Sequence, residues 1–229
     1  MNKKDWSSRL QQLKVVIRNP EHIEEARQVI LNLHSMLFVS QMSGCSSPTF
    51  EDELWEGLTE PVLRKATNSK GRTILYGLWH SSRIEDITMS LLVAGKNQLF
   101  EEGNWRKRIN SPVSHTGNSL DTREILRLSQ KIDIGALQHY RAAVGRQSRA
   151  IINGLQQGEL KRKIYKQNLQ RIIDEQAVDN VPSANWLIDF WGRKDVAGII
   201  LMPCLRHQLI HINESMQAKS KGSRMITSP

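Results

Sequence analysis

Two histidines near the carboxyl end of the chain have the spacing of a metal-binding pair. His207 and His211 lie four residues apart, so on an α-helix both imidazoles project from one face about one turn apart. In that position two imidazoles can chelate a single ion. The same spacing also occurs on solvated helix faces, so the pair by itself leaves both interpretations open.

Two further polar residues extend the face that carries this pair. Cys204 precedes His207 by three residues and Glu214 follows His211 by three. This spacing predicts one buried helix face with four polar side chains, and burying them costs free energy unless they bind something. Cys204 is interpreted either as a small buried residue or as a fourth ligand or redox-sensitive group. Glu214 is interpreted as a catalytic base or a group that orients a ligand imidazole, or else as one half of a salt bridge.

His80 is a candidate for the third ligand. It lies in a predicted helix from Thr73 to about Lys96, on the apolar stripe with Ile84 and Leu91, so its ring is expected to point into the core. The alternative is a core histidine hydrogen-bonded to a neighbour. Three neutral imidazoles leave one coordination position open for water, which is typical of catalytic zinc sites. An imidazole-only set does not choose among Zn²⁺, Ni²⁺, Fe²⁺ and Mn²⁺.

Other polar residues are assigned weaker roles. His34 lies beside Leu33 and Leu37 on the first long helix, where it either lines the pocket or is a hydrogen-bonded core residue. Glu85 and Asp86 follow His80 by five and six residues, so helix geometry directs them away from its face. They are predicted to cap helices or form salt bridges. His22, His115 and His139 fall in no constellation.

The elements that must position these residues are predicted to be helices. Apolar residues recur at helical spacing in four long stretches, at about 20–44, 73–96, 132–155 and 196–218. Helix starts are indicated by Thr49 with Asp52, by Asp121 with Glu124, and by Asp195. Weaker features are an irregular segment at 103–117, a separate basic helix at 160–177, a turn at 181–183 and a short apolar segment at 186–191. The predicted fold class is all-α, with the helices burying their apolar stripes against one another.

Composition and charge narrow the class of protein. The chain has 229 residues, 39% hydrophobic and 24% charged, as in one globular domain. No stretch approaches the roughly 20 apolar residues of a membrane span. Two cysteines and a polar start without a signal-like core favour the cytoplasm.

The net charge of +9 comes partly from the region 158–171 and from Lys219, Lys221 and Arg224. Nucleic-acid binding is not favoured, because no aromatic residues interleave as stacking platforms.

The sequence around the histidines resembles the DinB superfamily. The stretches Trp79–Asp86 and Leu91–Gly95 are similar to the second helix of that family, and His207–His211 is similar to its closing His-x-x-x-His. The resemblance implies a four-helix bundle over about 22–218 with a metal site at His80, His207 and His211. The stretch between His80 and His207 is longer than usual for that family, which marks 100–121 and 158–183 as insertions in a single domain.

The resemblance also implies an activity. Some members of that family are thiol-dependent S-transferases or isomerases that use small thiols. We therefore expect a metal-dependent enzyme that activates a water or a low-molecular-weight thiol against a small-molecule substrate, as a hydrolase or an S-transferase. A homodimer is compatible with this expectation. No serine triad, phosphate loop or nucleotide fingerprint is present in the sequence.

A second interpretation belongs to another class. The chain could be a non-catalytic, metal-stabilised helical bundle that binds a partner or nucleic acid through its basic face. A fourth protein ligand such as Cys204 would close the metal site and favour this structural role, whereas an open position would favour catalysis.

Overall fold

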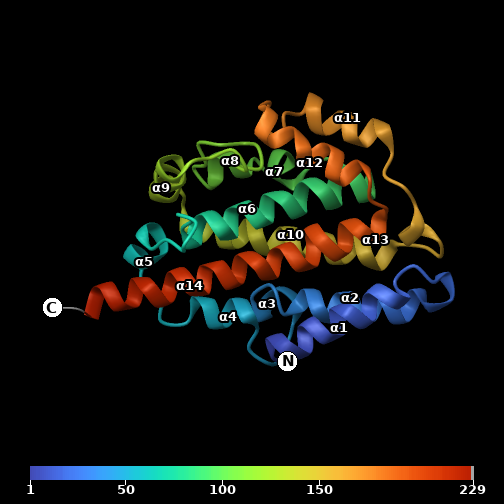
Figure 1. The fold of residues 1–229 in the computed structure, drawn as a ribbon, viewed down its shortest axis with the longest axis horizontal. Helices are drawn as coiled ribbons and strands as arrows, with labels where there is room; N and C mark the ends of the chain where they lie inside the picture. The colour runs from blue at the N-terminus through green and yellow to red at the C-terminus, as the bar shows by residue number, and fades with distance from the viewer. Residues whose placement is uncertain (228–229) are drawn as a thin grey trace.

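The computed structural model describes the backbone of residues 1–227, and the side chains of these residues except 183, 184 and 223–227. Arg224, predicted to contribute to a basic tail, therefore lies outside the described side chains. Within the described part the chain is helical, and its only β-type pairings are two isolated bridges. The predicted all-α class is confirmed (Figure 1). None of the described helices is long and apolar enough to cross a membrane.

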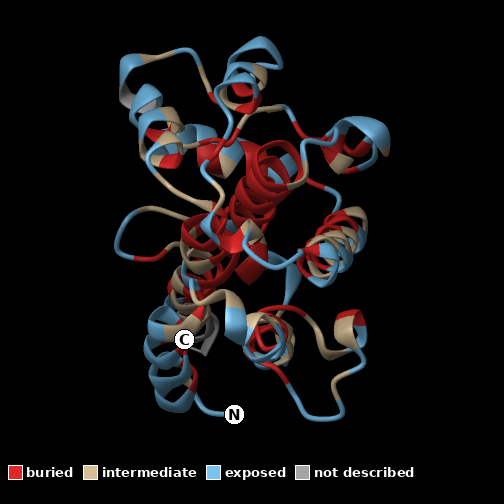
Figure 2. Ribbon diagram, turned by 90° about the vertical axis from the view of Figure 1, so that its right-hand side faces the viewer, coloured by how far each residue is buried: buried red, intermediate tan, exposed pale blue. Residues whose placement is uncertain are grey.

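Three long helical segments form the centre of the molecule. They are α6 (Ile74–Ile87), continued by the π-helical η2 (Thr88–Ala94); α10 (Ile134–Gly154); and the last helix, which runs through α13 (Val196–Ile199), the π-helical η4 (Ile200–Arg206) and α14 (His207–Thr227). Helix α6 packs against both α10 and α14. Every residue of α6 is buried, and buried residues gather at the centre of the molecule in Figure 2. A helix buried on all sides keeps its polar groups only if they find internal partners.

Shorter helices cover this centre. In Figure 1 one group lies near the amino terminus, below α14: α1 (Lys3–Val16), η1 (Pro20–His22), α2 (Ile23–Ser35), α3 (Ser40–Ser43) and α4 (Phe50–Trp55). Near the start of α6 lies α5 (Glu60–Lys65). On the other side of α6 are α7 (Leu99–Glu102), α8 (Trp105–Arg108), α9 (Thr122–Lys131), α11 (Lys166–Asp174) and α12 (Pro182–Gly192). The 3-10 turn η3 (Glu159–Lys161) precedes α11.

The predicted helix starts are confirmed. Thr49 and Asp52 form a reciprocal capping box, as do Asp121 and Glu124. The Asp195 carboxylate accepts a hydrogen bond from the Gly198 N–H at 2.8 Å and so begins the last helix. These caps satisfy backbone donors that would otherwise have no partner at a helix start.

The structure corrects three predicted boundaries and adds one helix. The first long helix ends at Ser35, because the Met36 carbonyl accepts a hydrogen bond from the Phe50 N–H at 3.0 Å. The basic helix expected at 160–177 is limited to α11. Pro182 begins α12 instead of forming a turn, since proline tolerates the first helical position. Helix α1 was not predicted, although its buried residues recur at helical spacing: Trp6, Leu10 and Leu13.

Candidate metal centre

The structure brings together three histidines from two helices. His80 comes from the middle of α6, and His207 and His211 come from the first turns of α14. One ring nitrogen from each lies within 4.8 Å of the others. Three atoms at such spacings share a centre less than about 3 Å from each, which is close to zinc–nitrogen bonds of about 2.0–2.1 Å. The group could hold a metal ion with only small side-chain adjustment.

The ring orientations direct the Nε2 atoms toward one another. His80 Nδ1 donates a hydrogen bond to the Thr116 carbonyl at 2.6 Å, so its Nε2 keeps a free lone pair. His211 Nδ1 lies 3.2 Å from a carboxylate oxygen of Glu214, and its Nε2 lies 3.2 Å from Nε2 of His207. A metal-ligating histidine usually has its other ring nitrogen oriented in this way. The Nδ1 atoms of His207 and His211 are both buried without a hydrogen bond of regular geometry, so His211 and Glu214 are in contact at ion-pair distance only.

The surroundings keep the three rings neutral. Burial lowers the pKa of His80 and of His207 well below the ordinary histidine value, and the neighbouring rings act in the same direction. Burial also lowers the pKa of His211, against the opposing effect of Glu214. Neutral imidazole is the form that binds metal ions. The group is therefore in its ligating state at neutral pH.

Glu214 contacts both a histidine of the group and two basic side chains. Its carboxylate contacts His211, and it also forms ion pairs with Lys70 Nζ at 2.8 Å and Arg72 Nη1 at 3.1 Å. Burial alone would raise its pKa, but these contacts with His211 and Lys70 hold that pKa well below its usual range. The carboxylate is thus ionised and fixed behind His211.

Two of these supporting groups were not predicted. The Thr116 carbonyl belongs to the segment 100–121, which was interpreted as an insertion, and a backbone carbonyl leaves no signal in the sequence. Arg72 precedes α6 by two residues and lies between Glu214 and the ring of Tyr76, which stacks on His80. Only the fold shows that these residues support the site.

Asp86 has the role expected from the sequence. It pairs with Arg83 at 3.3 Å and accepts hydrogen bonds from the backbone N–H groups of Leu99 and Phe100, each at 2.9 Å. It therefore caps α7 and takes no part in the histidine group.

Cys204 and His34 lie apart from the histidine group, and both are buried in the core, which agrees with the core-residue interpretation of each. Together with Glu85 they form a second buried group. The shared face expected for Cys204 and His207 assumed a continuous α-helix, but η4 is π-helical up to Arg206. Since a π-helix has more residues per turn than an α-helix, a three-residue spacing no longer aligns two side chains. Cys204 therefore does not extend the ligand face.

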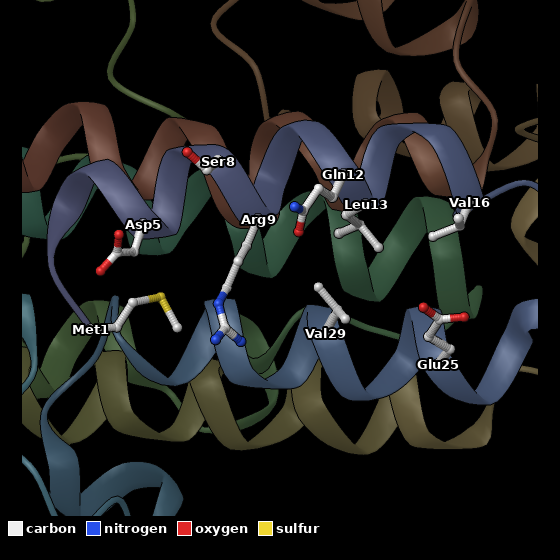
Figure 3. Close-up of a pocket in the computed structure, with 9 residues that line it drawn as sticks. All are labelled: Met1, Asp5, Ser8, Arg9, Gln12, Leu13, Val16, Glu25 and Val29. Atoms are coloured by element: carbon white, nitrogen blue, oxygen red, sulfur yellow. The ribbon is translucent and has the colours of Figure 1, made fainter.

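A surface hollow is separate from the histidines. It lies between α1 and α2 and is lined by residues such as Asp5, Arg9 and Glu25 (Figure 3). None of its lining residues belongs to the histidine group. Within that group, His80 and His211 are buried whereas His207 is partly exposed, so the histidines reach the surface on the side of His207.

Comparison with known proteins adds no assignment. No protein-family model matches the chain, and no curated protein matches it. Function must therefore be inferred from the geometry of the site.

Proposed function

We propose that His80, His207 and His211 bind one divalent metal ion and that the protein is a metal-dependent enzyme of the DinB-like, four-helix-bundle type. The observation that supports this most is the convergence of three neutral imidazoles from α6 and α14, two of them buried and that of His207 partly exposed. Among the described residues, no fourth histidine, cysteine or carboxylate joins that group. Three protein ligands with an open position are typical of catalytic sites.

The residues of the chain have distinct roles in this proposal. A divalent ion, either Zn²⁺, Ni²⁺, Fe²⁺ or Mn²⁺, supplies a Lewis acid that lowers the pKa of a water or a thiol. Thr116 fixes the tautomer of His80, and Glu214 orients His211. Because Glu214 is ionised and holds three partners, it is a weak base, and we assign it to positioning rather than to proton transfer.

The positive charge beside the site favours a substrate that carries an anionic group. The side chains of Lys70 and Arg72 are 62% and 32% exposed and stand next to Glu214. Two cations in this position suit an anionic group on the substrate or on a small thiol cosubstrate. Hydrolysis and S-transfer are the two reactions we propose to assay.

The alternative, a non-catalytic module with a basic binding face, has less support. Two arginines of the basic region 158–171 are used inside the molecule. Arg162 donates to the Val93 carbonyl at 2.7 Å, and Arg171 donates to the Gly95 carbonyl at 3.1 Å and pairs with Glu175. These contacts fix α11 and the segment before it against the end of η2, so both residues have a structural use.

Metal analysis of the purified protein and three variants tests the proposal. His207→Ala and His211→Ala should each bind one equivalent of divalent metal less than the wild type, because each leaves an incomplete ligand set. His139→Ala is the matched control, since His139 is exposed and outside the group. Equal metal content in all four proteins would exclude the site. A panel of thiol-transfer and hydrolysis substrates follows, with His207→Ala as the expected inactive variant.

A further inference from the structure

A second group of potential metal ligands lies in the core. His34 comes from α2, Glu85 from α6 and Cys204 from η4, and the relative exposure of His34, Glu85 and Cys204 is 0% in each case. One ligand atom of each lies within 4.8 Å of the others. None of the three residues belongs to the histidine group described above.

Glu85 differs from the other buried carboxylates in its partners. Asp86 is paired with Arg83, and Glu51 is paired with Arg141 at 2.8 Å. Glu85 contacts His34 Nε2 at 2.9 Å, the Gln208 amide at 2.6 Å and the Cys204 thiol. Within the described part of the chain, no lysine or arginine forms an ion pair with it. A buried carboxylate without a cation is costly.

One nitrogen of His34 is also left without a partner. Its Nδ1 is buried and makes no hydrogen bond, while its Nε2 faces Glu85. The contacts of Glu85 in the described part of the chain therefore come from a histidine, an amide and a thiol, none of which carries a fixed charge.

We propose that His34, Glu85 and Cys204 form a second metal site, which binds Zn²⁺. Imidazole, carboxylate and thiolate are all zinc ligands, and the two carboxylate oxygens bring the number of donor atoms to four, as in structural zinc sites. On binding, the thiol proton is released to solvent, because a coordinating thiol is deprotonated by the ion. The ion then balances one carboxylate and one thiolate.

This site is structural and independent of the proposed enzyme activity. It is enclosed, and it joins α2, α6 and the last helix directly beside the segments that carry His80 and His207. A metal held by residues from three elements stabilises the folded state, since the unfolded chain does not preform the site.

Absorption spectra with Co²⁺ as the probe separate the two sites. A thiolate bound to Co²⁺ gives a strong charge-transfer band in the near ultraviolet, which a site of three imidazoles cannot give. The chain has two cysteines, Cys45 and Cys204. Co²⁺ is added to the folded full-length protein and, in parallel, during refolding, so that burial does not prevent its entry.

We expect a band with the intensity of one thiolate-bound Co²⁺ per chain in the wild type, in Cys45→Ser and in His207→Ala. We expect this band to be lost in Cys204→Ser. The Cys45→Ser protein decides the question even if Cys204→Ser fails to fold, because Cys204 is then its single cysteine. Absence of the band from Cys45→Ser under both conditions would overturn the second site. Its persistence in His207→Ala, with one equivalent of metal lost, would support the second site and the proposed function separately.

Discussion

Glu214 shows how much one side chain can depend on its neighbours. On a bare helix it would be an ordinary carboxylate three residues past His211, whereas in the fold it is 9% exposed and in contact with His211, Lys70 and Arg72. The contacts with His211, Lys70 and Arg72 hold the pKa of the carboxyl well below its usual range, so an ionised carboxylate lies against the imidazole. The candidate ligand His211 is therefore backed by Glu214, which is in turn held by Lys70 and Arg72.

Replacing Glu214 with Gln tests this positioning role. The variant removes the charge that orients His211, and we expect metal affinity to fall by roughly 10- to 100-fold, as for other groups behind metal ligands. Affinity is measured by competition with a chromogenic chelator. Glu60→Gln is the matched control, because Glu60 pairs with Arg64 at a more exposed position, and it should leave the affinity unchanged. Equal affinities for the two variants would remove Glu214 from the site.

The lowered pKa values of the buried histidines predict a pH dependence of stability for the metal-free protein. Below pH about 6.5 the unfolded chain takes up protons at His80 and His211, while the folded chain does not. Stability therefore falls as the pH decreases, by roughly 1.4 kcal/mol per pH unit for each histidine until its folded pKa is reached. Urea unfolding at pH 7.5 and 5.5 measures this loss, which should be smaller in His80→Asn. An equal loss in both proteins would contradict the assignment.

The last helix is the element that controls the site. Asp195 caps its first turn and also pairs with Arg18 at 2.7 Å, while the π-helical turns of η4 set the direction in which Cys204 and His207 point. A change in the register of this helix would move ligands of both proposed metal sites. The cap and the π-helical segment therefore help to set the register of the helix that carries the candidate ligands.

Substitutions at Asp195 separate the cap from the ion pair. Asp195→Ala removes both, and we expect the free energy of unfolding to fall by about 1–2 kcal/mol. Asp195→Asn keeps a capping acceptor and loses only the partly exposed ion pair, so it should cost at most ~1 kcal/mol. Urea denaturation gives both values, and metal stoichiometry should not change in either variant. A larger loss for Asn than for Ala would show that the cap is unimportant.

At the scale of the whole molecule, one buried arginine links several elements. Arg141 on α10 pairs with Glu51 on α4, donates to Ser81 and Ser82 on α6 and to Gln208 on α14, and reaches the Leu37 carbonyl at 2.7 Å. Gln208 in turn donates to Glu85. This network joins the helices that carry the histidines and runs through the core next to both proposed metal sites.

Breaking this network should destabilise the whole fold. Arg141→Met leaves the Glu51 carboxylate buried without its cation, and we expect a loss of about 3–5 kcal/mol in the free energy of unfolding. The double variant Glu51→Gln with Arg141→Met should cost less than the sum of the two single changes, because each single change strands one charge. Thermal or urea unfolding of the three proteins measures this coupling. Strictly additive losses would show that the pair does not act as a unit.

Features that depend on neighbouring residues were predictable from the sequence. The caps at Thr49, Asp121 and Asp195, the apolar stripes of the long helices and the four-residue spacing of His207 and His211 are all local patterns. Helix α1 also has such a pattern, in Trp6, Leu10 and Leu13.

Which distant groups meet depends on how the helices pack. His80 meets His207 and His211 because α6 packs against α14, and Thr116 and Arg72 reach the site from loops. The group of His34, Glu85 and Cys204 is assembled from three elements and has no local signal. Periodicity and capping are set by interactions within a few residues, whereas helix packing depends on how all the apolar faces fit together. The three histidines could therefore be predicted as one group from their spacing and the family resemblance, but the groups behind them and the second buried group appear only in the fold.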